Sequence, residues 1–418
     1  MSITPRLGYR ASVSSRPSSR SASPPQVLIA GGGVAGLEAL VGLRTLAGER
    51  LELELISPER SFANRPLLVG AAFGAGPGPV IEVADVARTV DARCTVDAVT
   101  EVVPQANLIT LGDGTSRGYD ILVMAPGARP AGWIPGAIAF GAPGGTRRFR
   151  SVLAAAERES MSRIVFAIPD QVGWPLALYE LALLTADRLR ASGVDAQITL
   201  VTPEPAPLAA FGAHASSVVL DQLEEGGIRF VPGLHAEELA SGELRARPGN
   251  VRLQADAVVT LPTLCGPEIR GLPADEQGFI PVDRHGLVRG LEDVYAAGDA
   301  ISFPIKHGGL AAAQADAVAE AIAARVGAAV EPQPFRGVLR GLLLAGGQSH
   351  YLECAVEGAL GGAGAVSSKP LWWPPAKIAG RYIAPYLSGQ ISGPPAMPSP
   401  LPVALEIDLD ADRFPTLA

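Results

Sequence analysis

The sequence has few of the residues that staple small secreted folds or bind structural metals. Only three of its 418 residues are cysteines, and Cys94, Cys265 and Cys354 lie far apart, with no C-x-x-C pair or metal-ligand spacing. We therefore expect no disulfide framework and no metal site, in a reducing compartment. No apolar run approaches the ~20 residues that a membrane-spanning helix needs.

Charge is also sparse. Charged residues make up 18% of the chain, the net charge is −8, and no lysine and arginine face stands out, which argues against a nucleic-acid partner. With 48% hydrophobic residues, a chain of this length can build two or three domains. Residues 1–25 are rich in serine and arginine, and residues 391–418 are rich in proline and then acidic. We expect both to be disordered tails, and the first also resembles a transit peptide in composition.

What the sequence does have is a glycine turn after an apolar strand. Residues 27–36 read Val-Leu-Ile-Ala-Gly-Gly-Gly-Val-Ala-Gly, so Gly31, Gly33 and Gly36 fit G-x-G-x-x-G, and an apolar helical pattern follows. Gly31 permits the tight turn, Gly33 lets the backbone approach a pyrophosphate, and Gly36 lets helix and strand pack closely. The helix N-terminus adds free N–H groups and a partial positive charge. This order predicts a dinucleotide site.

The next strand, residues 51–56, runs into Ser57, Pro58 and Glu59. A dinucleotide fold usually carries an acid at this point to bind a ribose hydroxyl. Glu59 is our candidate, displaced by about two residues, and Ser57 is the weaker one. A solvated turn glutamate is the alternative.

A second strand–helix–strand unit begins at Arg163, with a helix over residues 176–190 and a strand over 197–201. Between its first strand and its helix, only Gly173 remains of a glycine fingerprint, and Trp174 and two prolines accompany it. The acid after the second strand is displaced to Glu204. Both departures argue against NAD(P)H binding in the usual mode, and a modified mode is the alternative.

The C-terminal part mixes aromatic and basic residues. Ile378, Tyr382 and Tyr386 have the i, i+4, i+8 spacing of one helical face, near Lys377 and Arg381. Aromatic and basic residues together suit a membrane interface. Prolines interrupt the segment, so packing over the first domain or a dimer contact is the preferred interpretation.

Four landmarks in order resemble flavoproteins with two dinucleotide-binding domains, which include the pyridine nucleotide–disulfide oxidoreductases. They are the glycine turn, Ala125-Pro126-Gly127-Ala128-Arg129-Pro130, the inserted unit from Arg163, and Tyr295-Ala296-Ala297-Gly298-Asp299. The stretches Pro304-Ile305-Lys306-His307-Gly308-Gly309 and Phe335-Arg336-Gly337-Val338-Leu339-Arg340-Gly341 are similar to those of sulfide:quinone oxidoreductases and type II NADH dehydrogenases.

This resemblance implies an α/β fold of two Rossmann-like, three-layer domains with parallel central sheets, the second inserted in the first. It implies an FAD-binding domain over 26–150 and 262–330, an inserted NAD(P)-binding-like domain over 151–261, and a C-terminal section over 331–390. Asp299 would bind the ribityl chain of FAD. The expected cofactor-binding residues are Gly31, Gly33, Val34, Ala35, Gly36, Ser57, Glu59, Arg65, Val99, Ala125, Gly127, Ala128, Gly298, Asp299, Gly309 and Leu310.

The chemistry expected is that of an FAD-dependent oxidoreductase. Lys306 is a candidate for tuning the flavin potential, with a solvated loop lysine as the alternative, and His307 is expected to bond rather than donate protons. Glu180 is read equally as a structural and a catalytic residue. Sulfide chemistry needs a redox-active cysteine pair, and the loop over 168–179 contains no cysteine.

Electrons would pass from a small-molecule or protein donor, through the flavin, to a quinone or a protein acceptor. The alternatives are an NAD(P)H dehydrogenase with a modified nucleotide loop, a sulfide:quinone oxidoreductase-like enzyme, and a non-catalytic FAD-binding partner protein. We expect a cytoplasmic protein, with peripheral contact at the inner face of a membrane and a homodimer as open alternatives.

Overall fold

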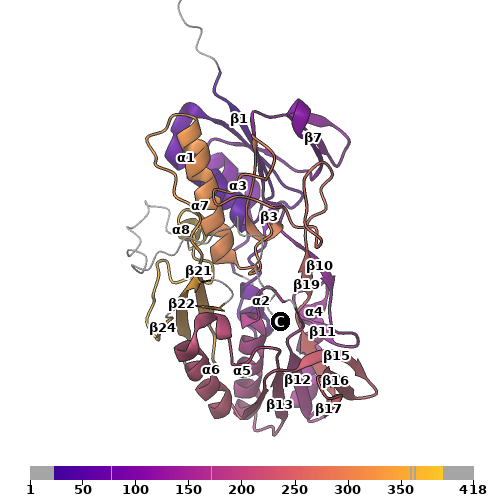
Figure 1. Cartoon of the computed structure of the whole chain (residues 1–418). Coiled ribbons are helices and arrows are strands. Elements are labelled where there is room, and N and C mark those ends of the chain that lie inside the picture. Colours follow the sequence, from indigo (N-terminus) through magenta and orange to yellow (C-terminus); the bar gives the residue numbers. More distant parts are fainter. Residues whose placement is uncertain (1–22, 77, 171, 358–359, 362–363, 389–418) are drawn as a thin grey trace, which may run out of the picture.

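The computed structural model describes residues 23–76, 78–170, 172–357, 360–361 and 364–388. The expected tails over 1–25 and 391–418 lie outside these ranges, apart from residues 23–25. The chain folds into an elongated molecule with one parallel sheet toward each end, and the C-terminal strands lie between them (Figure 1). The predicted α/β class with Rossmann-like parallel sheets is confirmed.

The first sheet contains five parallel strands in the order β20-β9-β1-β2-β5. They are β1 (Gln26–Ala30), β2 (Glu52–Ile56), β5 (Arg93–Thr95), β9 (Ile121–Met124) and β20 (Val294–Ala296). All four residues of β9 are buried, as expected of a parallel strand covered on both faces. The helices of this half are α1 (Val34–Ala47), α2 (Leu67–Ala72), α3 (Val83–Thr89) and α7 (Gly308–Arg325).

Helices α1 and α7 lie side by side against this sheet (Figure 1). The contact is close because both helices carry small residues: Ala35 and Ala39 of α1 and Ala311 and Ala315 of α7 are buried in one apolar cluster. This packing brings the N-termini of both helices to the same end of the sheet, beside the ends of β1 and β20.

The second sheet also contains five parallel strands, in the order β11-β18-β12-β13-β14. They are β11 (Ile138–Ala139), β12 (Arg163–Ala167), β13 (Gln197–Val201), β14 (Ile228–Val231) and β18 (Ala257–Thr260), with helices α4 (Gly145–Glu157), α5 (Leu176–Ala191) and α6 (Ala213–Glu225). This sheet begins before the expected residue 151, because β11 pairs with β18.

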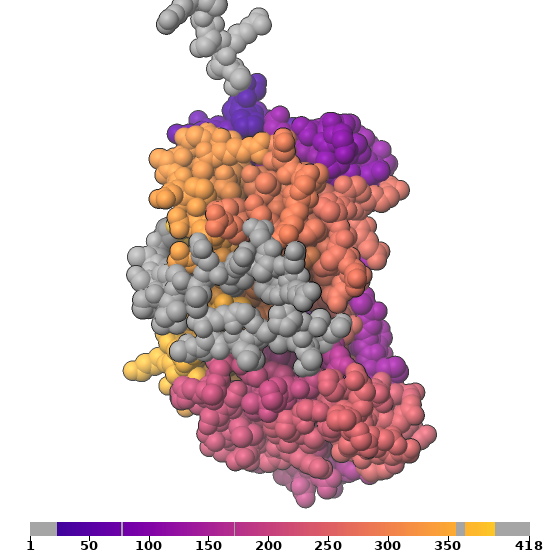
Figure 2. Space-filling view, viewed as in Figure 1, coloured from indigo at the N-terminus to yellow at the C-terminus, as the bar shows by residue number. Residues whose placement is uncertain are grey.

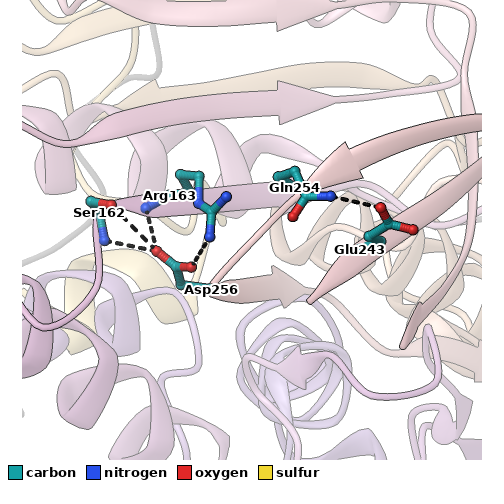
Figure 3. A network of polar contacts seen from close by, with 5 residues as sticks. All are labelled: Ser162, Arg163, Glu243, Gln254 and Asp256. Atoms are coloured by element: carbon teal, nitrogen blue, oxygen red, sulfur yellow. Dashed lines mark hydrogen bonds and ion pairs between the residues drawn. The ribbon is translucent and has the colours of Figure 1, made fainter. Parts of the chain in front are cut away.

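A polar network holds the start of this sheet together (Figure 3). The Asp256 carboxylate accepts hydrogen bonds from the backbone N–H of Ser162 and Arg163, at 2.9 and 3.0 Å, and from the Arg163 side chain at 2.6 Å. These bonds lower the pKa of Asp256 to about 2, the Arg163 side chain first among them. Gln254 and Glu243 make a similar link nearby, at 2.6 Å. The network fixes β12 beside β18.

Smaller sheets accompany the two parallel sheets. They are β3 (Ser61–Phe62) with β4 (Ile81–Glu82), β6 (Val99–Val103) with β7 (Leu108–Leu111) and β8 (Ser116–Gly118), β10 (Arg129–Gly132) with β19 (Thr263–Cys265), and β15 (His235–Ala240) with β16 (Glu243–Arg247) and β17 (Val251–Gln254). Single 3-10 turns are η1 (Gly48–Arg50), η2 (Pro104–Ala106), η3 (Ala209–Phe211) and η4 (Gly298–Ala300).

The C-terminal section is an antiparallel sheet followed by an extended segment. Its elements are β21 (Val338–Leu343), β22 (His350–Glu357), β23 (Leu360–Gly361), β24 (Ala365–Ser367) and α8 (Ile383–Leu387). Figure 2 shows the end of the described chain, in yellow, at the level where the two halves of the molecule meet.

One expectation for this section is wrong. Ile378, Tyr382 and Tyr386 do not share a helical face, because only Ile383–Leu387 is helical. Pro374 and Pro375 cannot donate helical hydrogen bonds, and the Glu38 carboxylate accepts the N–H groups of Tyr382 and Ile383 instead.

Candidate functional site

The glycine turn lies between β1 and α1 and is shaped as a dinucleotide cradle. A Cβ atom added to Gly31, where φ is +121°, would lie 2.1 Å from the carbonyl oxygen of Ala125, and one added to Gly36 would lie 1.8 Å from the carbonyl oxygen of Gly31. A Cβ atom added to Gly33 would meet nothing within 4 Å. The turn is therefore tight on the protein side and open at Gly33, where a pyrophosphate would approach.

The expected ribose residues lie beside this turn at the end of β2. Ser57 is buried, and its hydroxyl donates to the carbonyl oxygen of Glu59 at 2.9 Å. A Cβ atom added to Gly32 would lie 2.5 Å from the Ser57 Oγ, so the two segments touch. Glu59 is exposed. Val99 starts β6, and Asp97 just before it donates its N–H to the carbonyl oxygen of Ser57.

The remaining expected residues converge on the ends of β9 and β20. Gly127, with φ +75°, and Ala128 follow β9, and Gly298, with φ +79°, follows β20. A Cβ atom added to Gly298 would lie 2.8 Å from the Cβ of Ala35 in the first turn of α1. The other members of this set belong to helix N-termini: Val34 begins α1, and Gly309 and Leu310 lie in the first turn of α7.

Asp299 follows Gly298 and carries the negative charge of the site. Burial raises the pKa of Asp299, and the positive charges of Lys306 and Arg65 lower it in part. No hydrogen bond from a described residue contributes to this shift. The carboxylate therefore keeps accepting capacity for the hydroxyl groups of a ligand.

Lys306 lies between Asp299 and a cavity. Its Nζ donates to the carbonyl oxygen of Ile301 at 2.6 Å and lies 3.6 Å from the ring centroid of Phe279. Burial lowers the pKa of Lys306 to about 8, against the opposing effect of Asp299 and Asp275. The ammonium is thus mostly charged at neutral pH, yet it can exchange a proton near that pH.

The cavity beside Lys306 has a volume of about 260 Å³. Its walls come from four separated segments of the chain: Gly173, Leu264, Asp275, Gln277, Phe279, Ser302, Phe303, Pro304 and Lys306. Asp275 is already held by the hydroxyl of Ser302 at 2.7 Å and by the N–H groups of Gln277 and Phe279, each at 2.9 Å. Lys306 is the one lysine in this wall, which is otherwise largely apolar.

His307 caps the helix that begins in this site. Its Nδ1 accepts the N–H of Gly309 at 3.2 Å, and its ring lies 4.5 Å from that of Trp174. Burial lowers the pKa of His307 to about 4, and the positive charges of Lys377 and Arg340 contribute. The imidazole is therefore neutral at physiological pH, and its position suits a structural acceptor.

In the described part of the inserted unit, the two acids nearest the expected dinucleotide site are bonded within the protein. Glu204 is half-buried and accepts from the Tyr179 hydroxyl at 2.7 Å, the Thr202 hydroxyl at 3.1 Å and the Ala209 N–H at 3.2 Å. It therefore serves the protein core rather than a ribose. In the loop after β12, Asp170 places a carboxylate where a phosphate would approach, 2.7 Å from Arg247.

Two buried acids hold the C-terminal section: Glu180, for which the sequence left a structural and a catalytic role open, and Glu38, which the sequence analysis did not single out. Glu180 of α5 forms an ion pair with Lys377 and accepts the N–H of Leu344 at 2.9 Å. Glu38 of α1 is fully buried and accepts the N–H groups of Tyr382 and Ile383, at 2.8 and 2.7 Å. Glu38 could have been noticed in the sequence, because it is an acidic residue within the apolar helical pattern that follows the glycine turn.

A second carboxyl group faces Glu38. Asp316 of α7 hydrogen-bonds with it, and burial followed by the Glu38 charge holds the pKa of Asp316 well above its usual range. Burial also raises the pKa of Glu38. Two adjacent buried carboxylates would repel each other, and this repulsion favours the protonated form of one of them.

The cysteines are not paired. Cys265 is half-buried in β19 and Cys354 is buried in β22, and none of the three cysteines forms a disulfide in the described chain. Strands β19 and β22 belong to different sheets, and the structure records no disulfide of the kind that sulfide chemistry would use.

Comparisons with known proteins identify the family of this chain and the folds that it resembles. The model of the pyridine nucleotide-disulphide oxidoreductase family matches residues 25–321. The fold is similar to that of a sulfide:quinone oxidoreductase from Aquifex aeolicus, with a TM-score of 0.72 and 18% identity over 82% of this chain and 86% of that one. It is also similar to a ferredoxin reductase from Rhodopseudomonas palustris, with a TM-score of 0.62 and 21% identity over 80% of this chain and 83% of that one.

A third similar structure is an NAD-dependent persulfide reductase from A. fulgidus, with a TM-score of 0.58 and 20% identity over 79% of this chain and 64% of that one. The open space at Gly33 and the carboxylate of Asp299 fit the FAD that such proteins bind. The chain belongs to the pyridine nucleotide-disulphide oxidoreductase family and is an FAD-dependent oxidoreductase.

Proposed function

We propose that this oxidoreductase takes electrons from a small anionic donor bound in the Lys306 cavity and passes them to a quinone or a protein acceptor. The observation that carries the proposal is the position of Lys306, which lines the cavity and also faces Asp299. FAD supplies the electron-transfer chemistry when bound. The protein supplies a binding place next to it and a positive charge that attracts the donor.

The size of the cavity supports a small donor. Pockets for drug-sized ligands span about 300–1,000 Å³, and this one holds about 260 Å³. A complete nicotinamide dinucleotide would need a second binding surface on the inserted unit. There, Glu204 is bonded to Tyr179 and Asp170 is paired with Arg247, so neither is available to a dinucleotide, which supports a donor other than NAD(P)H in the usual mode.

The small number of cysteines and their wide spacing lead us to infer a reducing, cytoplasmic setting, with peripheral membrane attachment as the alternative. Within the described part of the chain, no helix combines the length and the apolarity that crossing a bilayer requires. Fractionation of cells in low and high salt tests this assignment, since a peripheral protein would sediment with membranes at low salt only.

Anaerobic reduction of the purified yellow protein tests the proposed donor. Sodium sulfide, glutathione, lactate, NADH and NADPH are each mixed with it, and the loss of flavin absorbance is followed. We expect a small anion to bleach the flavin, and Lys306→Met to slow that reaction while Lys369→Met, at an exposed position, leaves it unchanged. Rapid bleaching by NADH that does not depend on Lys306 would refute the proposal.

A further inference from the structure

Two neighbouring segments of this acidic protein contain no acidic residue. The chain has 42 aspartates and glutamates and a net charge of −8, yet residues 62–81 and 121–156 contain five arginines and neither an acid nor a lysine. The structure brings these segments together, because α2 of the first packs on α4 of the second. Phe73, just after α2, and Phe149 of α4 are in edge-to-face contact, with ring centroids 5.7 Å apart.

Three of these arginines cluster at the start of α4. Arg147, Arg148 and Arg150 are exposed, and within the described ranges none of them forms an ion pair. The first turn of α4 contains no acid, and its N-cap, Gly144, provides no side-chain cap. Positive charges near a helix N-terminus oppose the helix dipole, so this arrangement does not serve the stability of α4.

The cluster is one short helix away from the cofactor site. Arg65, which lowers the pKa of Asp299, lies two residues before α2. Six residues of helix span about 9 Å, and at the far end of α2 the Arg150 guanidinium donates to the carbonyl oxygen of Ala71. Figure 1 shows α2 and α4 next to each other in the middle of the molecule. The arginines therefore mark a surface close to the expected flavin.

We propose that the start of α4 is the docking surface for an acidic electron-carrier protein, which accepts the electrons of the reduced flavin. The inference rests on the proposed function and names the class of its acceptor. Charge complementarity identifies the partner: arginine is favoured in protein interfaces, and an isolated positive patch on a negative protein steers and orients an acidic partner.

Binding is measured first, without turnover. Isothermal titration of the FAD-loaded protein with an oxidised, acidic plant-type [2Fe–2S] ferredoxin should give a Kd that rises about ten-fold as salt is raised from low to moderate concentration. Arg147→Glu/Arg148→Glu should weaken binding at least about ten-fold. The matched control, Arg117→Glu/Arg229→Glu, makes the same charge change at exposed residues of β8 and β14 and should bind as the wild type does.

Electron transfer is measured next, with photoreduced protein in a stopped-flow instrument. The double glutamate variant should reduce the ferredoxin at least about ten-fold more slowly and an uncharged short-chain quinone at the wild-type rate. If both double variants bind ferredoxin equally well, the proposed docking surface at the start of α4 is refuted. Quinone reduction at the wild-type rate would then leave the proposed function standing. Loss of binding to phosphatidylglycerol vesicles, but not to ferredoxin, would assign the patch to a membrane and refute the protein partner. Failure to reduce either acceptor would count against the proposed function itself.

Discussion

Glu180 and Lys377, 197 residues apart, form an ion pair in the interior, with side chains only 2% and 10% exposed. Lys377→Met would leave the Glu180 carboxylate buried without its countercharge. We expect a loss of about 3–5 kcal/mol in the free energy of unfolding, measured by urea denaturation of the FAD-loaded protein. Glu180→Met/Lys377→Met should recover most of this loss, because it removes both charges. A loss no larger than that of Lys369→Met would contradict a structural role for the pair.

Gly33→Val tests the cradle. Nothing lies within 4 Å of an added Cβ atom and the backbone has an ordinary φ of −83°, so the variant should fold. The valine side chain would fill the space that the pyrophosphate needs, and the FAD content, read from the ratio of absorbance at about 450 and 280 nm, should fall close to zero. Gly347→Val is the matched control, since its added Cβ also meets nothing within 4 Å. Normal FAD content in Gly33→Val would show that the cofactor lies elsewhere.

His307 should make stability depend on pH. Its pKa is about 4 in the folded protein and 6.5 ordinarily, so the unfolded chain binds the extra proton between these values. The contribution of the neutral ring is complete above pH 6.5 and is lost as pH falls toward 4, by about 3 kcal/mol in all. His307→Asn keeps an acceptor for the Gly309 N–H and should lose that part of the pH dependence in urea denaturation between pH 4 and 7. Parallel curves for both proteins would contradict the assignment.

Asp316→Asn should act in the opposite pH range. The pKa of Asp316 is raised, so folding favours its protonated form, and this part of the stability declines as pH rises from the ordinary carboxyl pKa through the raised one. An uncharged amide removes the repulsion with Glu38. The variant should match the wild type near pH 4 and be more stable at pH 8 by about 1–2 kcal/mol. Thermal unfolding at both pH values measures the difference, and a variant less stable at pH 8 would refute the repulsion between Asp316 and Glu38.

Lys306→Met should weaken the donor site selectively. Hydrogen bonds to charged groups contribute about 1.5–3 kcal/mol, so the donor concentration for half-maximal flavin reduction should rise about ten-fold or more. FAD content should remain near that of the wild type, since the glycine turn and Asp299 are unchanged. An equal loss of FAD and of donor affinity would show that Lys306 acts through the cofactor rather than through the cavity.

The local pattern of the sequence predicted the parts of the molecule that depend on neighbouring residues. The glycine turn of residues 31–36 and the strand before it are dictated by backbone freedom and by apolar continuity, and both lie where they were expected. The expected helix over 176–190 is also present as α5. Family membership followed from these motifs and their order.

Contacts between distant residues were not predictable in this way. The section over 331–390 is shaped by Glu38 and Glu180, whose partners lie 164 to 345 residues away. The displaced acid Glu204 points into the core because Tyr179 supplies a hydroxyl there. The cavity at Lys306 combines four separated segments of the chain, so it forms only when the sheets are assembled.

The two buried glutamates also constrain the order in which the molecule is completed. Lys377, Tyr382 and Ile383 leave the ribosome late, after both parallel sheets have been synthesised. Until then, Glu180 lacks the Lys377 ammonium that neutralises it, and Glu38 lacks the two backbone N–H groups that donate to it. The nascent protein therefore passes through a stage in which the C-terminal segment is not yet bonded to α1 and α5, so the contacts that join this segment to both halves of the molecule form last.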